Sequence, residues 1–432
     1  MMQSWFPEAK LGIFIHWGIY AVNGTAESWA IFNNEVPYDA YMNQRHGFTA
    51  AHYDPNAWAE LFQRIGARYV VLTTKHHDGM ALWDTQASDL NVIKQSPAGR
   101  DLIKPYVQAI RDHGLKVGLY FSHLDWSHPD YALIPPADRD AEHFRGARQP
   151  NDPAAYRRLW GEQGANSAGW QRFLAFREAQ LRELCTNYGQ IDLLWFDGDW
   201  TPDDDDYWKM PVLREQLHVW QPNIVLNSRM RGCGDYKTPE QGIPVARPEG
   251  PWEFCVTLND SWGYRPSDHN YKSVPQLVRM FAECIGMGGN MLLDVGPMAD
   301  GIIPPEQVTR LEGLGDWIRR HAEAIYDTQA GLPAGHHYGA STLSKDRQTL
   351  YLICFDRPRE QIAIKGIRNA IKSISIYGNQ LTFQQLGGAS WARVPGVLWI
   401  DVPESVLDPI ATVIKVELEG PLDLYTGAGD RG

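Results

Sequence analysis

The sequence predicts an α/β protein in which a (β/α)8-like barrel, not necessarily regular or complete, precedes a C-terminal antiparallel β-sandwich. Up to about residue 330, continuous apolar runs alternate with amphipathic stretches. This alternation is typical of parallel strands that helices cover on both faces. After that point, short strand-like runs recur about every ten residues between turn residues, which indicates a sandwich. We therefore expect a barrel domain at 1–332 and a sandwich domain at 333–432.

Each predicted element follows from its local pattern. The helix at 54–66 begins with an Asp-Pro pair and ends at Gly, and the helix at 101–114 also begins at Asp and ends at Gly. The other expected helices are 169–189, 274–289 and 305–328. The expected barrel strands are 11–18, 67–74, 115–122, 191–198, 223–229 and 290–297. The expected sandwich strands are 349–356, 360–367, 371–378, 381–386, 397–403 and 411–420.

Composition limits the class of protein. The net charge of −12 without long runs of one sign argues against a nucleic-acid partner. No run is apolar enough for a membrane span. The five cysteines form no CxxC pair, and the first residues lack the pattern of a signal peptide, so we expect a cytoplasmic location, with a truncated secretory signal left open. The 17 Trp, 19 Tyr and 14 Phe suit a site that stacks aromatic rings on sugars.

Polar and aromatic residues gather where the predicted strands end. In a barrel these carboxyl ends meet at one mouth, where active sites lie. Five successive strands bring such groups there, which favours one functional pocket over five structural coincidences. The groups are His16, His76 and His77, Tyr120, Trp195 with Asp197, and Arg229.

Asp197 stands out because it ends an apolar strand. Side chains alternate along a strand, so Leu193, Trp195 and Asp197 share one face. A buried carboxylate without a partner is costly, so Asp197 either caps the next segment or has a chemical task. The task that we favour is nucleophilic attack on an anomeric carbon.

A retaining glycosidase needs a second carboxyl group about 5–5.5 Å from the first, held protonated to serve the leaving oxygen. The candidates on later loops are Glu240, in DYKTPEQ, and Glu253, in PWEFC. Asp235, Glu249 and Asp260 are less favoured. We expect Glu240 to be the acid/base and keep Glu253 as the alternative.

Two histidines in a row raise a further question. Side chains of adjacent strand residues point to opposite faces, so His76 and His77 cannot both face the pocket if the strand stays regular. One of them could be a core histidine bonded to a carbonyl. A zinc site built from His16, His76, His77 and Asp197 is a weaker alternative, because no HxH or HExxH spacing supports it. We therefore expect no metal and no cofactor.

Several stretches, in this order, resemble the family 29 glycoside hydrolases, the α-L-fucosidases. They are WFPEAKLGIFIHWGIYAV, YVVLTTKHHDGMALWDT, GRDLIKPYVQAIRDHGLKVGLYFS, LLWFDGDW, WEFCVTLNDSWGY and GGNMLLDVGPMADGIIP. The resemblance covers residue 4 to about 328, and the last hundred residues match only as the family's usual β-sandwich. It implies exo-hydrolysis of α-linked L-fucose from glycans or glycosides, with retention and without metal.

The resemblance also implies roles for individual residues. Asp197 stands at the family's nucleophile position, and the TPE of DYKTPEQ favours Glu240 as the acid/base. Trp29, in Glu27-Ser28-Trp29, matches a Glu-Trp stretch of the family loosely. Asp294, in LLDVGP, departs from the family, where Asn is more usual. The implied substrate-binding residues are His16, Trp29, His76, His77, Tyr120, Trp195, Arg229 and Trp262, the last against the C5 methyl group of fucose.

Two other functions stay open at this stage. A fucose-binding protein on a catalytically inactive hydrolase scaffold would bind the sugar without turnover. A glycosidase for a related sugar, such as an α-L-galactoside, would differ in how the pocket treats the C6 hydroxyl. The expected partner is a fucosylated oligosaccharide or glycoside, and homo-oligomerisation is left open.

Overall fold

The computed structural model of the chain describes residues 2–33, 35–131, 168–199, 205–355 and 361–428. Its first domain is built on a seven-stranded sheet of order β5-β4-β3-β2-β1-β7-β6, in which all paired neighbours are parallel. The strands are β1 (Leu11–Ile15), β2 (Tyr69–Lys75), β3 (Lys116–Ser122), β4 (Leu193–Asp197), β5 (Val225–Leu226), β6 (Glu253–Thr257) and β7 (Asn290–Val295).

The curled sheet is not closed by pairing between β5 and β6. The segment 236–240 lies between them instead, joined by single parallel bridges from Tyr236 to Asn227 and from Glu240 to Cys255. This segment takes the place of an eighth strand without forming a regular one. The expectation of an irregular (β/α)8-like barrel with a C-terminal sandwich is confirmed, and this gap is where the barrel is irregular.

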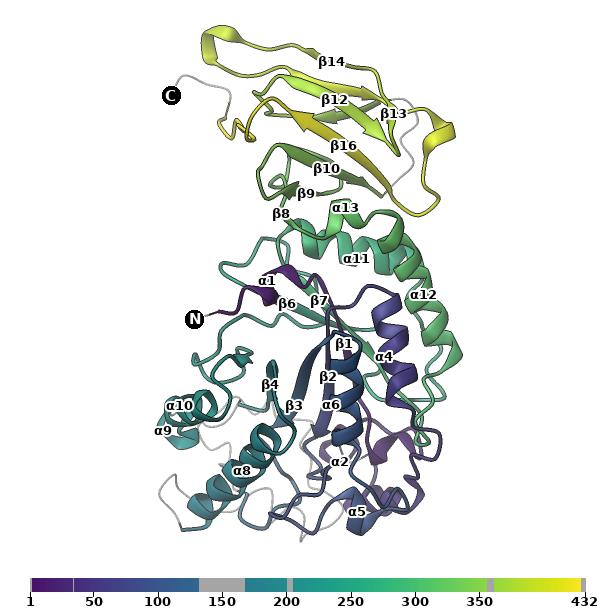
Figure 1. Cartoon of the computed structure of the whole chain (residues 1–432), viewed down its shortest axis with the longest axis vertical. Helices are drawn as coiled ribbons and strands as arrows, with labels where there is room; N and C mark the ends of the chain where they lie inside the picture. The colour runs from purple at the N-terminus through teal and green to yellow at the C-terminus, as the bar shows by residue number, and fades with distance from the viewer. Residues whose placement is uncertain (1, 34, 132–167, 200–204, 356–360, 429–432) are drawn as a thin grey trace.

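Helices cover the outer face of the sheet (Figure 1). Capping explains where two of them begin: the Asp54 side chain accepts bonds from the first backbone N–H groups of α4, and Ser273 forms a capping box with Gln276 at the start of α11. The longer helices are α4 (Pro55–Arg64), α6 (Ile103–Asp112), α8 (Ala168–Thr186), α10 (Met210–Trp220), α11 (Val274–Gly286) and α12 (Pro305–Arg320). The short ones are α1 (Trp5–Glu8), α2 (Trp29–Phe32), α3 (Tyr38–Asn43), α5 (Val92–Gln95), α9 (Asp205–Trp208) and α13 (Ala322–Ile325).

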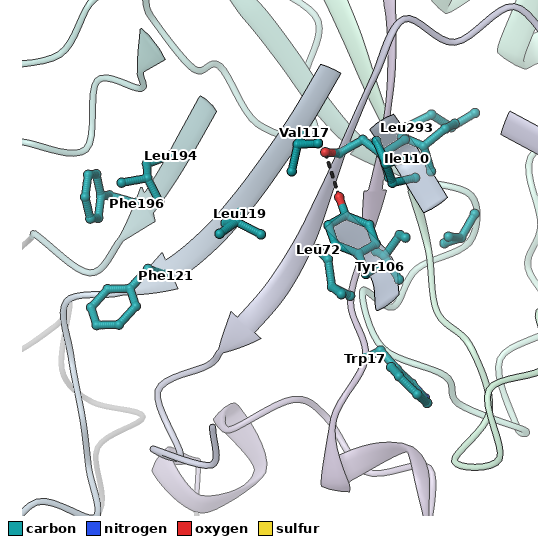
Figure 2. Packing of buried hydrophobic residues seen from close by; sticks show 14 of the residues in the cluster. Trp17, Leu72, Tyr106, Ile110, Val117, Leu119, Phe121, Leu194, Phe196 and Leu293 are labelled. Carbon is teal, nitrogen blue, oxygen red and sulfur yellow. Dashed lines mark hydrogen bonds between the residues drawn. The ribbon is translucent and has the colours of Figure 1, made fainter. Parts of the chain in front are cut away.

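The sheet separates two apolar layers. On β4, Leu194 and Phe196 pack outward against the helices, whereas Leu193 and Trp195 face the barrel interior. Figure 2 shows the outer layer, where Tyr106 of α6 lies among aliphatic side chains; its hydroxyl donates to the Val70 carbonyl. The predicted alternation along β4 is therefore confirmed, and it places Asp197 on the interior side, where strand and mouth meet.

The second domain consists of a six-stranded antiparallel sheet, β13-β12-β16-β10-β9-β8, and a three-stranded sheet, β11-β15-β14. Their facing side chains form a separate apolar core. In Figure 1 this domain lies beyond α11 and α13, at the far end from α2 and α5. The strands are β8 (Thr328–Ala330), β9 (Ala340–Ser344), β10 (Thr349–Cys354), β11 (Gln361–Ile364), β12 (Ile371–Ile376), β13 (Asn379–Gln380), β14 (Phe383–Leu386), β15 (Val397–Asp401) and β16 (Thr412–Leu418).

The division of the chain at 332/333 stays a prediction. β8 already pairs with β9 before that point, and Trp317 of α12 donates to the carbonyl of Ala411 in the second domain. The sequence reasoning missed β6, β8 and β9, and it merged α12 with α13. Within the described residues, no helix combines the length and apolarity needed to cross a bilayer.

Candidate active site

A cavity of about 410 Å³ opens at the carboxyl ends of the parallel strands. This is the end of a barrel at which active sites are found. Of the predicted site residues, the cavity walls include all except His77 and Glu253. The lining residues are Phe14, His16, Glu27, Trp29, His76, Tyr120, Trp195, Asp197, Arg229, Glu240 and Trp262.

Asp197 lies at the end of β4, and its side chain is 13% exposed. Its Oδ1 accepts a bond from Arg229 Nη1 at 2.5 Å and from the Gly198 backbone N–H at 2.8 Å. Its Oδ2 accepts from the Tyr120 hydroxyl at 3.0 Å. Burial alone would raise the pKa of this carboxyl, but Arg229, His77 and the hydrogen bonds together hold the pKa below its usual value. Asp197 is therefore an ionised carboxylate that faces the cavity.

Glu240 lies on the segment that fills the gap between β5 and β6. Its backbone bridges to Cys255 of β6, which fixes its place on the rim. Its Oε2 accepts a bond from Arg229 Nη2, and its side chain is 37% exposed. The Arg229 guanidinium lies 4.7 Å from the Trp195 ring centroid. One guanidinium thus contacts both Asp197 and Glu240, so the two carboxyl groups lie on the same side of one cavity.

Glu253 lies elsewhere, inside the barrel below the cavity. It is fully buried and begins β6. Its carboxyl accepts bonds from Tyr69 at 2.5 Å, from Trp195 Nε1 at 2.8 Å and from Tyr236 at 3.4 Å. Burial raises the pKa of this carboxyl to about 7 against the opposing effect of these bonds. Glu253 does not contact the cavity; it supports the Trp195 indole, which does.

His76 lines the cavity and His77 does not, so one of the two histidines forms part of the cavity wall. Both follow the end of β2 at Lys75, so the alternation of a regular strand does not apply to them. The His76 Nδ1 pairs with the Ser28 hydroxyl at 2.7 Å. The His77 Nδ1 pairs with the Ser122 hydroxyl at 2.6 Å. His77 Nε2 lies 3.6 Å from Asp197 Oδ2, behind the cavity wall.

Aromatic rings form much of the wall. The Tyr120 ring is stacked between His76, with centroids 5.4 Å apart, and Trp195, with centroids 5.7 Å apart. Trp262 lies against His16 with centroids 4.9 Å apart. Rings next to polar groups suit a sugar, which has apolar C–H faces and hydroxyl edges.

Sequence reasoning missed two cavity residues, Phe14 and Glu27. Phe14 lies on β1, two positions before His16 on the same face, which is the signal that could have found it. Glu27 begins the Glu27-Ser28-Trp29 stretch, and its place two residues before Trp29 is the signal that could have found it. Burial raises the pKa of the Glu27 carboxyl to about 7, and the Gly263 backbone N–H lies 3.4 Å from its Oε2.

The zinc alternative can be compared with the geometry. Ligand-capable atoms of His76, His77 and Asp197 lie within 4.8 Å of one another. His16 is not part of this group. The Arg229 guanidinium contacts Oδ1 of Asp197 and puts a positive charge beside this group, which opposes the binding of a cation.

The barrel and the two carboxylates at its mouth define the class of protein as a glycoside hydrolase. A sequence model of the α-L-fucosidase family matches residues 1–323, and the chain belongs to that family. The resemblance seen in the sequence motifs is thereby confirmed.

Known α-L-fucosidases match between three quarters and nearly all of the chain. The tissue α-L-fucosidase of Mus musculus is 31% identical over 98% of this chain and 92% of its own length. The plasma α-L-fucosidase of Homo sapiens is 31% identical over 76% of this chain and 70% of its own. The structure of α-L-fucosidase isoenzyme 1 from Paenibacillus thiaminolyticus matches with a TM-score of 0.83 at 34% identity, over 96% of this chain and 98% of that one.

A further structural neighbour bears on the chemistry. The family 29 α-L-fucosidase of Bacteroides thetaiotaomicron, solved as a trapped covalent intermediate with 2-fluoro-fucosyl fluoride, matches with a TM-score of 0.79 at 25% identity. The alignment covers 96% of this chain and 95% of that one.

The expected cytoplasmic location is wrong. The relatives include plasma enzymes, and plasma is an extracellular fluid. The inference rested partly on unpaired cysteines. Four of the five cysteines are buried, and burial raises the pKa of the Cys185 thiol to about 12. Buried thiols are inert in any compartment, so their presence carries no information about location.

Proposed function

We propose that this chain is a retaining exo-α-L-fucosidase in which Asp197 is the nucleophile and Glu240 the acid/base. The observation that carries the assignment is the Arg229 guanidinium, which contacts both carboxylates at the edge of one sugar-sized cavity. Retaining glycosidases need two carboxyl groups about 5–5.5 Å apart. The neighbour trapped as a covalent intermediate supports a double displacement.

In the first step, an oxygen of Asp197 attacks the anomeric carbon while the bond to the leaving oxygen breaks. Attack requires an ionised carboxylate, and the low pKa of Asp197 supplies it. The bonds from Arg229 and Tyr120 also aim the carboxylate toward the cavity. A glycosyl ester on Asp197 results, and water hydrolyses it in the second step.

The proton for the leaving oxygen comes from Glu240, which then accepts a proton from the attacking water. Oε2 of Glu240 accepts a bond from Arg229 Nη2. In the proposed step this oxygen has to face the leaving oxygen instead, so the Arg229–Glu240 contact has to open. A sugar that enters between the two side chains supplies the displacement, so proton donation becomes coupled to substrate binding.

Recognition of fucose combines polar and apolar contacts. His16, His76 and Arg229 present nitrogen atoms to the hydroxyl groups, and Trp262 offers an apolar surface to the C5 methyl group. A methyl group in a hydrophobic pocket contributes only about 1–3 kcal/mol of discrimination. The hydroxyl contacts therefore carry most of the specificity in this proposal.

The proposed partners are glycans or glycosides with a terminal α-linked L-fucose. Homo-oligomerisation stays a prediction, which light scattering on the purified chain will decide. A protein that only binds fucose would show saturable binding of L-fucose without release of any aglycone.

The test is hydrolysis of p-nitrophenyl α-L-fucoside, followed by proton NMR. The proposal predicts nitrophenol release, with α-L-fucose as the first anomer formed. If β-L-fucose appears first, the reaction inverts and Asp197 is not a covalent nucleophile. The absence of any release from a folded enzyme would favour the binding protein.

A further inference from the structure

Asp294 lies directly behind the cavity wall, on β7. Its side chain is 1% exposed, and its Oδ1 lies 2.7 Å from Nδ1 of His16. In the described part of the chain, His16 is the one side chain bonded to this carboxyl group. Asp294 is thus a buried carboxyl whose contact with the cavity runs through a single imidazole.

The His16 ring is held firmly between aromatic neighbours. Its centroid is 4.5 Å from Phe14 and 4.9 Å from Trp262, and the ring forms part of the cavity wall. Asp294 occupies Nδ1, so Nε2 is the polar atom of the ring that remains for a ligand. Whether Nε2 donates or accepts a hydrogen bond depends on where the proton of the pair resides.

Electrostatics indicate that the pair keeps one acidic proton. Burial raises the pKa of Asp294 well above its usual value, and the Glu27 carboxyl adds to this, against the opposing effects of the His16 backbone N–H and of Lys272; burial also lowers the pKa of His16 to about 3. A carboxylic acid at Asp294 donates to Nδ1, which leaves the hydrogen of the neutral imidazole on Nε2. The charged or titratable groups that face the pair are Tyr20, Glu27, His76, His77, Tyr120, Asp197 and Lys272.

We propose that Asp294 is a positioning residue that fixes His16 with its Nε2–H directed into the cavity, as a hydrogen-bond donor to a sugar hydroxyl. This inference rests on the proposed function, because the ligand is the fucosyl group. An asparagine could donate to Nδ1 or accept from it, and so supports both tautomers. A protonated aspartic acid supports only the donor form. Loss of its proton turns Nε2 into an acceptor and adds a negative charge near the nucleophile.

The proton position is tested without any substrate. Nitrogen-15 NMR of the histidine-labelled protein, with the His16 signals assigned through His16→Gln, is recorded near pH 6. The proposal predicts hydrogen on Nε2 of His16 in the wild type and a mixture of tautomers in Asp294→Leu. An unprotonated Nε2 in the wild type would overturn it.

The role in binding is tested with L-fucose, which is uncharged, as a competitive inhibitor from pH 5 to pH 10. At pH 6 we expect the inhibition constant of Asp294→Asn to stay within about threefold of the wild type, because the amide can replace the donor. Asp294→Leu removes the hydrogen bond and should raise the constant about tenfold. In alkali the wild-type constant should rise, whereas that of Asp294→Asn should stay flat.

Asp192→Asn is the matched control. Asp192 is also a buried aspartate of the barrel, but it precedes β4 at the opposite end and accepts from the Val117 backbone N–H. The Asp192→Asn substitution should leave the inhibition constant of L-fucose unchanged at every pH. An Asp294→Leu protein that is folded by its thermal midpoint and binds L-fucose like the wild type would overturn the inference. If L-fucose fails to bind the wild type while the NMR result is as predicted, the hydrogen-bonded Asp294–His16 pair is retained and the proposed function is wrong.

Discussion

The rim and the interior of the barrel each hold a glutamate that the sequence offered as proton donor, and their surroundings differ in kind. Glu240 on the rim is 37% exposed and contacts a guanidinium. Glu253 in the interior is sealed from the cavity and is bonded to two phenols and an indole. Both belong to neighbouring segments, because Glu240 bridges to Cys255 of β6 and Glu253 begins β6. In the proposed mechanism, solvent access and the charge of the partner, more than proximity in sequence, decide which carboxyl group does the chemistry.

The largest effect on activity is expected from substitution of Asp197, the proposed nucleophile. Asp197→Ala removes the nucleophile, so kcat/KM for p-nitrophenyl α-L-fucoside should fall by about 10⁴-fold or more. Asp197→Asn, which keeps the volume, should be similarly inactive. Circular dichroism and a thermal melt will show that both proteins are folded. Wild-type turnover by either one would remove Asp197 from the mechanism.

The second prediction separates the two glutamates. Glu240→Ala should lose about 10²- to 10⁴-fold in kcat on substrates with poor leaving groups, because general acid catalysis contributes about that much. Azide should restore turnover of an activated fucoside by attacking the glycosyl ester in place of water, and it should yield α-fucosyl azide. Glu253→Gln is the control and should show no rescue. Rescue of a Glu253→Ala protein would transfer the role to the interior residue.

The third prediction concerns stability at the interior site. Burial raises the folded-state pKa of Glu253 from 4.5 to about 7. Its stabilising contribution is therefore complete below about pH 4.5 and is lost as pH rises through about 7. Between pH 4 and pH 9 the wild type should lose up to about 3 kcal/mol of unfolding free energy relative to Glu253→Gln. Denaturant titrations will measure it, and a constant difference would contradict the raised pKa.

The smallest effect is expected from the apolar wall. Trp262→Ala should lower kcat/KM for the fucoside by about tenfold, and the preference for fucoside over α-L-galactoside should narrow. Parallel kinetics with the two nitrophenyl glycosides will test this. If the preference is unchanged, the methyl group is read by another side chain.

Much of the fold followed from pattern alone. Parallel strands buried on both faces are continuous apolar runs, so β1 to β4 and β7 could be placed within a few residues. β6 was missed because polar and aromatic motif residues crowd its start, which hid its short apolar stretch. β8 and β9 are rich in small and polar residues, and only pairing with neighbours makes them strands.

The site was predictable where one strand decides the direction of a side chain. Asp197 and Trp195 followed from alternation along β4, and the structure places both on the predicted face. The position of Glu240 depends on a bridge to Cys255 of a distant strand, which local pattern does not contain. The placement of His76 in the cavity wall and of His77 behind it depends on the end of β2 at Lys75. Contacts between remote segments are what the sequence reasoning lacked.

The central claim is that Asp197 forms a covalent bond to the sugar opposite Glu240. The most direct test is to incubate the enzyme with 2-deoxy-2-fluoro-fucosyl fluoride and to map the labelled peptide by tandem mass spectrometry. The account predicts one fluorofucosyl group, attached to the Asp197 side chain and absent from Asp197→Asn. Attachment to Glu240 or Glu253 would contradict it, as would an unlabelled enzyme that still hydrolyses fucosides.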